Sequence, residues 1–167
     1  MIALLSAMIW TPIVGAVLVL MRGQNTQQAR ILACLVALIT ALLSAWMAWH
    51  FDAQSSALQF AEHVPWLPLF NMHYDLGVDG ISMPLICLTT FTNLLIVGSS
   101  WYLVKDKVAQ YLAAFLMLEA MTIGIFSALD GMLFYLFWEG TLIPMYLCIG
   151  IWGGENRHFA AMKFFVY

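Results

Sequence analysis

The sequence is poor in charged residues, which make up only 9% of the chain, whereas hydrophobic residues make up 63%. A soluble domain usually carries about 25% charged residues. The composition therefore excludes an ordinary soluble domain. Cysteine is also scarce, and Cys34, Cys87 and Cys148 all lie within apolar runs with no CxxC spacing. This pattern predicts neither a disulfide framework nor a zinc site.

Motifs for phosphate or cofactor chemistry are missing as well. The sequence has no glycine-rich phosphate loop, no metal-ligand cluster and no nucleophile with its base. We therefore expect no redox cofactor and no metal in this chain. The lipid bilayer is the expected surrounding, and no nucleic acid is expected as a partner.

The apolar runs are long enough to cross a membrane, because about 20 residues of helix cross about 30 Å of hydrocarbon. Polar breaks separate five such runs, at residues 2–21, 31–49, 81–104, 111–129 and 132–152. A sixth run starts at 159 and reaches Tyr167, which is short of a crossing. We predict an all-α integral membrane helix bundle with five transmembrane helices and the start of a sixth. The sequence is expected to be part of a longer protein.

The cations indicate the orientation in the membrane. They lie after every second run, and the loops in between contain acids but no Lys or Arg. Short loops rich in Lys and Arg stay on the cytoplasmic side. We therefore expect a multi-pass protein with its amino terminus outside. The six cations are Arg22, Arg30, Lys105, Lys107, Arg157 and Lys163.

The long outer loop between the second and third runs has a strand pattern. Residues 70–79 alternate between apolar and polar types, which is typical of a half-buried β-strand. Residues 58–60 would supply a shorter partner across a turn region from Pro65 to Pro68. We predict a small β-hairpin on the outer face that contacts a neighbouring subunit through a strand edge. The alternative is an amphipathic stretch resting on lipid headgroups.

Glu139 is the only Asp, Glu, Lys, Arg or His between Met132 and Trp152. A charged residue at the bilayer centre costs about 2.5 to 3.5 kcal/mol on insertion scales, so such residues are usually functional. Since the first five runs contain no cation, Glu139 must be protonated, solvated by internal water or paired with a Lys or Arg from elsewhere. Each state suits a group that changes charge during transport. The alternative is a structural acid hydrogen-bonded between helices.

Pro144 follows Glu139 by five residues and removes the backbone donor that would bond the Gly140 carbonyl. A loosened turn beside the acid is expected, which would let water approach the backbone at membrane depth. The alternative is a proline tolerated without a role.

Glu119 is a second candidate acid. Counted from Asp130, it lies about 16 Å along its helix and Glu139 about 13 Å along the next, so both lie near the bilayer centre. Whether they face each other depends on helix rotation. Lys163 has a side chain long enough to reach Glu119 from the cytoplasmic side, or it extends to the membrane interface instead.

Four segments carry a resemblance to a known family: Leu76–Ser82 (LGVDGIS), Phe134–Tyr146 (FYLFWEGTLIPMY), Gly150–Gly153 (GIWG) and Lys163–Tyr167 (KFFVY). Together they resemble the amino-terminal third of subunit M of proton-pumping NADH:quinone oxidoreductase, respiratory complex I. This family is related to the subunits of multisubunit cation/proton antiporters. Its full subunit is much longer, so the resemblance implies an amino-terminal part of an antiporter-like membrane subunit over residues 1–167, inactive alone.

The resemblance also implies functional roles. Glu139 matches the family's acid of the fifth helix, which pairs with a Lys on a later helix and takes part in proton translocation coupled to quinone reduction. Relatives can carry an apolar residue at the position of Glu119. The expected location is the bacterial inner membrane, with a periplasmic amino terminus and neighbouring antiporter-like subunits as partners. NADH, FMN, iron–sulfur clusters and quinone would bind to other subunits. The alternatives are a subunit of a sodium/proton antiporter and a non-catalytic membrane scaffold.

Overall fold

The structure is a computed structural model, and it describes residues 3–23, 25–55, 57–67 and 72–166. Six helices lie in this part of the chain, and five of them are long and apolar enough to cross a membrane. The predicted helix bundle with five spans and the start of a sixth is therefore confirmed. The helices are α1 (Leu4–Met21), α2 (Thr26–His50), α3 (Ser82–Leu103), α4 (Val108–Ser127), α5 (Gly131–Trp152) and α6 (Arg157–Val166).

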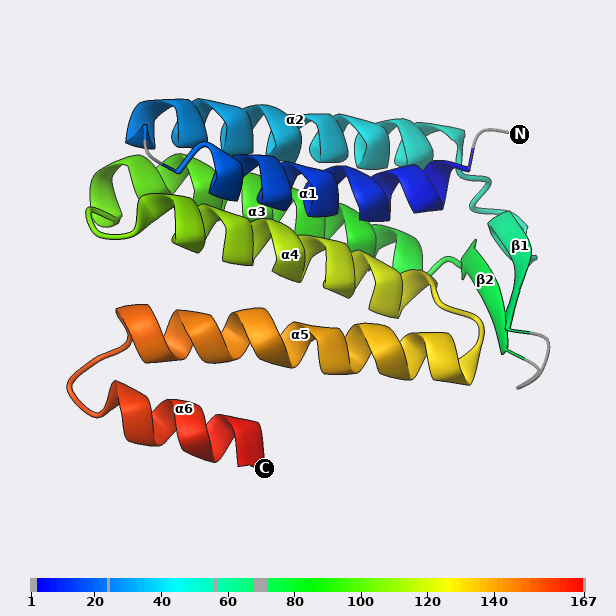
Figure 1. The fold of residues 1–167 in the computed structure, drawn as a ribbon. Helices are drawn as coiled ribbons and strands as arrows, with labels where there is room; N and C mark the ends of the chain where they lie inside the picture. Colours follow the sequence, from blue (N-terminus) through cyan, green and yellow to red (C-terminus); the bar gives the residue numbers. More distant parts are fainter. Residues whose placement is uncertain (1–2, 24, 56, 68–71, 167) are drawn as a thin grey trace.

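The first four helices form a compact group, whereas the last two are added in sequence along one side (Figure 1). Helix α4 contacts α1, α2 and α3, and it also carries α5 on its remaining side. Helix α6 packs on α5. Because of this arrangement, α4 is the central helix of the chain, and α5 has only one long helix of this chain beside it.

The two ends of the bundle differ in charge and in structure. Figure 1 places the α1–α2, α3–α4 and α5–α6 connections at one end and the β-hairpin at the other. The first of these ends carries Arg22, Arg30, Lys105, Lys107 and Arg157. There, Arg30 Nη2 donates a hydrogen bond to the carbonyl of Val104 at 2.8 Å, which ties α2 to the end of α3.

The hairpin consists of β1 (Gln59–Leu67) and β2 (Met72–Val78), which pair in antiparallel orientation. The predicted hairpin is confirmed, but its predicted partner strand was too short, and residues 65–67 of its predicted turn region belong to β1. Strand β1 continues well beyond residue 60 and includes Pro65, which pairs with His73. Proline has no backbone N–H to donate, and it is tolerated here because β1 is an edge strand, where an outward-facing N–H would have no strand partner. Residues 68–71, which include Pro68, lie outside the described residues.

Strand β2 is fastened to the helices by backbone and side chain. The Leu129 N–H, between α4 and α5, donates to the carbonyl of Asp75 at 2.9 Å, and Leu76 pairs with Ala128. The side chains of Leu76 and Val78 are fully buried. The hairpin is therefore part of the packed structure, which rules out a loose amphipathic stretch.

Strand β1 supplies the cap that α1 lacks. No side chain at Ala3 caps this helix. Instead, the Glu62 carboxylate accepts hydrogen bonds from the backbone N–H of Leu5 at 2.8 Å and of Ser6 at 3.3 Å, and from the Ser6 hydroxyl. The first N–H groups of a helix have no partner within it, so this carboxylate stabilises the start of α1.

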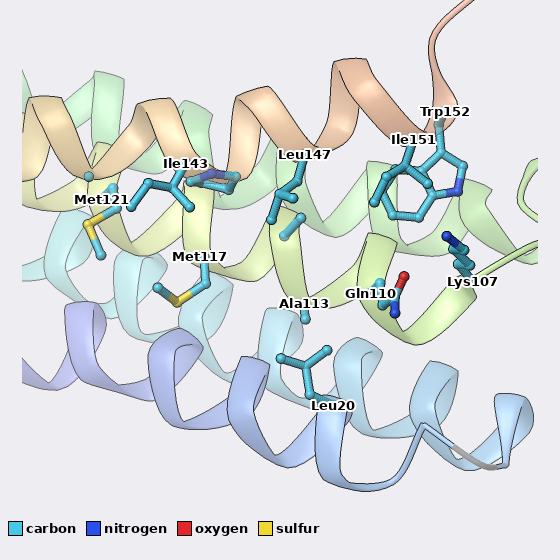
Figure 2. Close-up of a pocket in the computed structure, with 13 residues that line it drawn as sticks. Leu20, Lys107, Gln110, Ala113, Met117, Met121, Ile143, Leu147, Ile151 and Trp152 are labelled. Carbon is cyan, nitrogen blue, oxygen red and sulfur yellow. The ribbon is translucent and has the colours of Figure 1, made fainter. Parts of the chain in front are cut away.

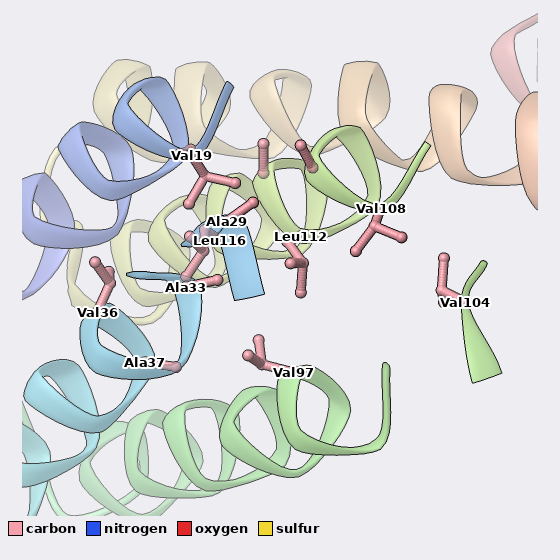
Figure 3. Close-up of a cluster of buried hydrophobic side chains, with 13 residues drawn as sticks. Val19, Ala29, Ala33, Val36, Ala37, Val97, Val104, Val108, Leu112 and Leu116 are labelled. Carbon is pink, nitrogen blue, oxygen red and sulfur yellow. The ribbon is translucent and has the colours of Figure 1, made fainter. Parts of the chain in front are cut away.

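Two buried apolar clusters hold the bundle together. The one nearer the cationic end includes Ala29, Ala33 and Ala37 on one face of α2, packed with Val97 of α3 and Leu112 of α4 (Figure 3). Small residues let membrane helices approach closely, which is the main source of packing energy in lipid. The other cluster lies beneath the hairpin and combines β2 with α1 and α3.

Candidate functional site

Glu119 is the buried acid of the bundle, with only 2% of its surface exposed. Its Oε1 lies within hydrogen-bond distance of Thr40 Oγ1 of α2, at 2.9 Å, and its Oε2 accepts a hydrogen bond from Asn93 Nδ2 of α3 at 2.6 Å. Three helices therefore meet at this carboxyl group. The sequence placed Glu119 second to Glu139, whereas the structure gives it the more complete set of partners within this chain.

A second polar contact lies about one helical turn nearer the hairpin. Ser44 Oγ of α2 and Thr90 Oγ1 of α3 are 2.6 Å apart, and both residues are buried. With Thr40 and Asn93, they form a short polar line between α2 and α3. Sequence reasoning missed all four residues, although each interrupts an apolar run at a similar depth.

Glu139 lies on α5 and is partly exposed. Only Leu133 and Pro144 are buried among the residues of this helix, because α5 meets α4 on one side and the short α6 on another. The structure thus leaves much of the α5 surface uncovered by this chain, and Glu139 lies partly exposed on this helix.

The two carboxyl groups do not face each other. The Glu119 side chain points to α2 and α3, and the side of α4 that meets α5 contains Met121 and Gly124. Gly124 lies directly against the Phe137 ring, and Gly140 lies against Met121. Helix rotation, which the sequence left open, therefore separates the two acids.

An apolar cavity of about 570 Å³ lies between α1, α4 and α5 (Figure 2). Met117 and Met121 of α4 and Ile143 and Leu147 of α5 line it, and the polar side chains of Lys107 and Gln110 lie toward one end. Pro144 also lines the cavity, and α5 remains helical through this residue. The cavity contributes no acid, so the α4–α5 interface beside Pro144 is apolar.

Lys163 lies exposed on α6, with Nζ 4.9 Å from the centre of the Phe159 ring. Helix α6 packs on α5, and no ion pair joins Lys163 to Glu119 among the residues that the structure describes. The two oxygens of Glu119 are already occupied by Thr40 and Asn93. The suggested Lys163–Glu119 pair is thus not formed in this structure.

The acids at the hairpin end cap helices. Asp130 Oδ1 accepts from the backbone N–H of Met132 and Leu133 at the start of α5, and the bond from Leu133 is the main cause that lowers the pKa of this carboxyl group. Asp79 Oδ1 accepts from the N–H of Ser82 at 2.7 Å, which lowers its pKa in the same way. These acids have a structural explanation.

No group of three or more His, Cys, Asp or Glu side chains lies close enough to hold a metal ion within the described ranges.

Comparisons with known proteins identify relatives of this chain. It is 44% identical, over 98% of its length, to subunit M of the NADH-quinone oxidoreductase of Rhodobacter capsulatus. A chain of respiratory complex I from Thermus thermophilus with bound NADH has the same fold over 98% of this chain, with a TM-score of 0.82 and 27% identity. The chain is a homologue of NADH-quinone oxidoreductase subunit M.

This homologue of subunit M spans about one third of the length of the curated relatives that it matches, for example 32% of the Rhodobacter protein. It is also 35% identical over its whole length to subunit M of the F(420)H(2) dehydrogenase of Methanosarcina mazei. The family described as "NADH:quinone oxidoreductase/Mrp antiporter, TM" matches residues 128–167, a range that contains α5 with Glu139.

Proposed function

We propose that this chain is part of a proton-translocating membrane subunit of an NADH:quinone oxidoreductase, and that Glu139 takes up and releases a proton in its working cycle. One observation carries the proposal: the only charged residue of α5 lies near the middle of this helix, inside the range that matches the family described as "NADH:quinone oxidoreductase/Mrp antiporter, TM". Intramembrane acids mark proton paths in many transporters.

The surroundings of Glu139 suit a group that exchanges charge with a partner. Only Leu133 and Pro144 of its helix are buried by this chain, so a cation from another segment or subunit has room to approach. A nearby cation favours the charged carboxylate, whereas withdrawal of the cation in an apolar setting favours the neutral acid. Movement of that partner would drive proton uptake and release. The partner that we propose is a Lys on a later helix.

The orientation follows from the charges at the two ends of the bundle. We place the cationic end in the cytoplasm and the hairpin end in the periplasm of a bacterial inner membrane. In this orientation, the outer edge of β1 is available to a neighbouring antiporter-like subunit. Electron transfer is left to other subunits, with their NADH, FMN, iron–sulfur clusters and quinone. The chain is similar both to a subunit of an NADH-quinone oxidoreductase and to a subunit of an F(420)H(2) dehydrogenase. These enzymes have different electron donors, which fits a membrane subunit that does not itself bind the donor.

A sodium/proton antiporter subunit is the second candidate, because the matching family also includes Mrp antiporter subunits. The two functions use the same kind of membrane carboxyl group. They differ in the energy source, which is electron transfer in the first case and a sodium gradient in the second. A non-catalytic membrane scaffold would use neither.

The test uses inverted membrane vesicles that contain the complete assembly. NADH should drive proton uptake in the wild type, and Glu139→Gln should abolish most of it without loss of assembly. Glu155→Gln is the matched control, because Glu155 is an exposed acid in the loop after α5. Proton movement that requires a sodium gradient instead of NADH would favour the antiporter. Full NADH-driven uptake in Glu139→Gln would favour the scaffold.

A further inference from the structure

The Glu119 site is built for a carboxyl group without a cation. Five elements contact α4, and α1 among them has no titratable side chain. The titratable side chains on the other four are Arg30, Cys34 and His50 on α2, Cys87 and Tyr102 on α3, Tyr135, Glu139, Tyr146 and Cys148 on α5, and His73, Tyr74 and Asp75 on β2. The nearest cation along α2, Arg30, is about 15 Å from Thr40 by helix rise and bonds Val104 instead. An ionised Glu119 would therefore be buried without a countercharge, which is very costly.

A protonated, neutral carboxyl group would avoid this cost, and the hydrogen bonds of Thr40 are consistent with one. Thr40 Oγ1 lies 2.9 Å from Glu119 Oε1, and also 3.0 Å from the Ala37 carbonyl and 3.2 Å from the Val36 carbonyl. A hydroxyl group has one hydrogen but can accept as well. If Thr40 donates to its own helix backbone, the hydrogen between Thr40 and Glu119 must come from the carboxyl group. Asn93 then donates to Oε2, which is the carbonyl oxygen of the acid.

Access from outside is provided by a groove of about 340 Å³ between α3 and α4. Glu119 and Asn93 line it, together with three threonines and four apolar residues: Thr89, Thr92, Thr122, Leu88, Ile96, Phe115 and Leu118. The groove lies on the side of α4 away from the apolar cavity near Pro144. It leaves space for water beside the acid.

We propose that Glu119 is a second proton-binding site, in which a neutral carboxyl group donates its hydrogen to Thr40 and exchanges it with water in the groove between α3 and α4. On release, the O–H bond of the carboxyl group breaks and water accepts the proton. The Thr40 hydrogen then turns from the backbone carbonyl to Oε1, so that the carboxylate accepts from both Thr40 and Asn93. Proton binding reverses these changes.

The site is separate from Glu139 and goes beyond the proposed function. It does not require Glu139 to translocate protons, because its partners are on α2 and α3 and its groove lies on the other side of α4. Its role is to store a proton within the first four helices. A failure of the Glu139 proposal would therefore leave it intact, and the reverse also holds.

Infrared spectroscopy of the complete assembly in membranes tests the protonation state. We expect a C=O stretching band of a protonated carboxylic acid that disappears in Glu119→Gln and persists in Glu139→Gln. The band should move to lower wavenumber after transfer to D₂O, because the proton exchanges. In Asn93→Leu it should move to higher wavenumber, since the carbonyl oxygen loses its donor. Identical acid-region spectra for wild type and Glu119→Gln, or a band that never responds to D₂O, would overturn the proposal.

Assembly levels provide the second measurement. Glutamine has the shape of the neutral acid, so that its oxygen can accept from Asn93 and its amide can donate to Thr40. Glu119→Gln should therefore assemble as the wild type does, whereas Glu119→Leu should assemble less, because it leaves Asn93 buried without its partner. Equal losses in both variants would show that an ionised carboxylate is needed, which contradicts the proposal.

Discussion

The cap of α1 by Glu62 leads to a prediction about local stability. Strand β1 and helix α1 are far apart in the sequence, yet one carboxylate satisfies the N–H groups of Leu5 and Ser6. These are the second and third residues of α1, the same donors that an ordinary N-cap side chain satisfies. Replacement of Glu62 by Ala should therefore loosen the start of α1 and detach β1 from it.

The magnitude follows from the two roles of this carboxylate. Loss of an N-cap acceptor costs about 0.5 to 2 kcal/mol. Loss of a negative charge near a helix N-terminus costs about 0.3 to 1 kcal/mol more. We expect Glu62→Ala to cost about 0.8 to 3 kcal/mol locally, which corresponds to a roughly 4- to 160-fold change in the opening equilibrium. Glu62→Gln keeps an acceptor but loses the charge, so its effect should be about a third as large in free energy.

Amide hydrogen exchange of the amino-terminal peptide is the assay. Exchange at Leu5 and Ser6 should accelerate in Glu62→Ala by the factor given above, less in Glu62→Gln and not at all in Glu155→Ala, where the acid removed is at the opposite end of the bundle. Protection that is unchanged in Glu62→Ala would refute the capping role.

Two further predictions concern packing and pH. In Gly124→Ala, the new Cβ would lie 2.5 Å from ring carbons of Phe137, so the variant should lose about 1 to 3 kcal/mol of stability, measured by thermal unfolding. Gly98→Ala, which has open space, should be neutral or slightly stabilising. The pKa of Asp130 is lowered in the folded state, so its capping contribution is present above the carboxyl group's ordinary pKa and is lost as the pH falls through the lowered value. Thermal unfolding of Asp130→Asn should therefore depend less on pH across the acidic range than that of the wild type, and an unchanged pH dependence would contradict this assignment.

The spans could be predicted from sequence because the charges lie almost entirely between them. The hairpin was predicted from the alternation in β2, but most of β1 was not. Strand β1 contains Pro65, which in sequence indicates a turn, and only the tertiary placement of β1 at an open edge makes that residue acceptable. The capping role of Glu62 depends on this same placement.

Sequence could not predict that Glu119 is more buried than Glu139 and has more partners within this chain, because both properties depend on helix rotation. Helix α4 is apolar on nearly all sides, so periodicity does not show which face is turned to α2 and α3. Asn93 and Thr40 indicate which face of α4 is turned to α2 and α3. A buried amide and hydroxyl at the depth of Glu119 indicate a common interface, yet each alone is only one polar residue in an apolar run.

The most direct test of the account is the number of protons taken up per NADH oxidised in Glu139→Gln vesicles with normal assembly levels. If this carboxyl group exchanges protons in the working cycle, the ratio falls well below that of the wild type and of Glu155→Gln. A ratio equal to that of the wild type would contradict the role assigned to Glu139.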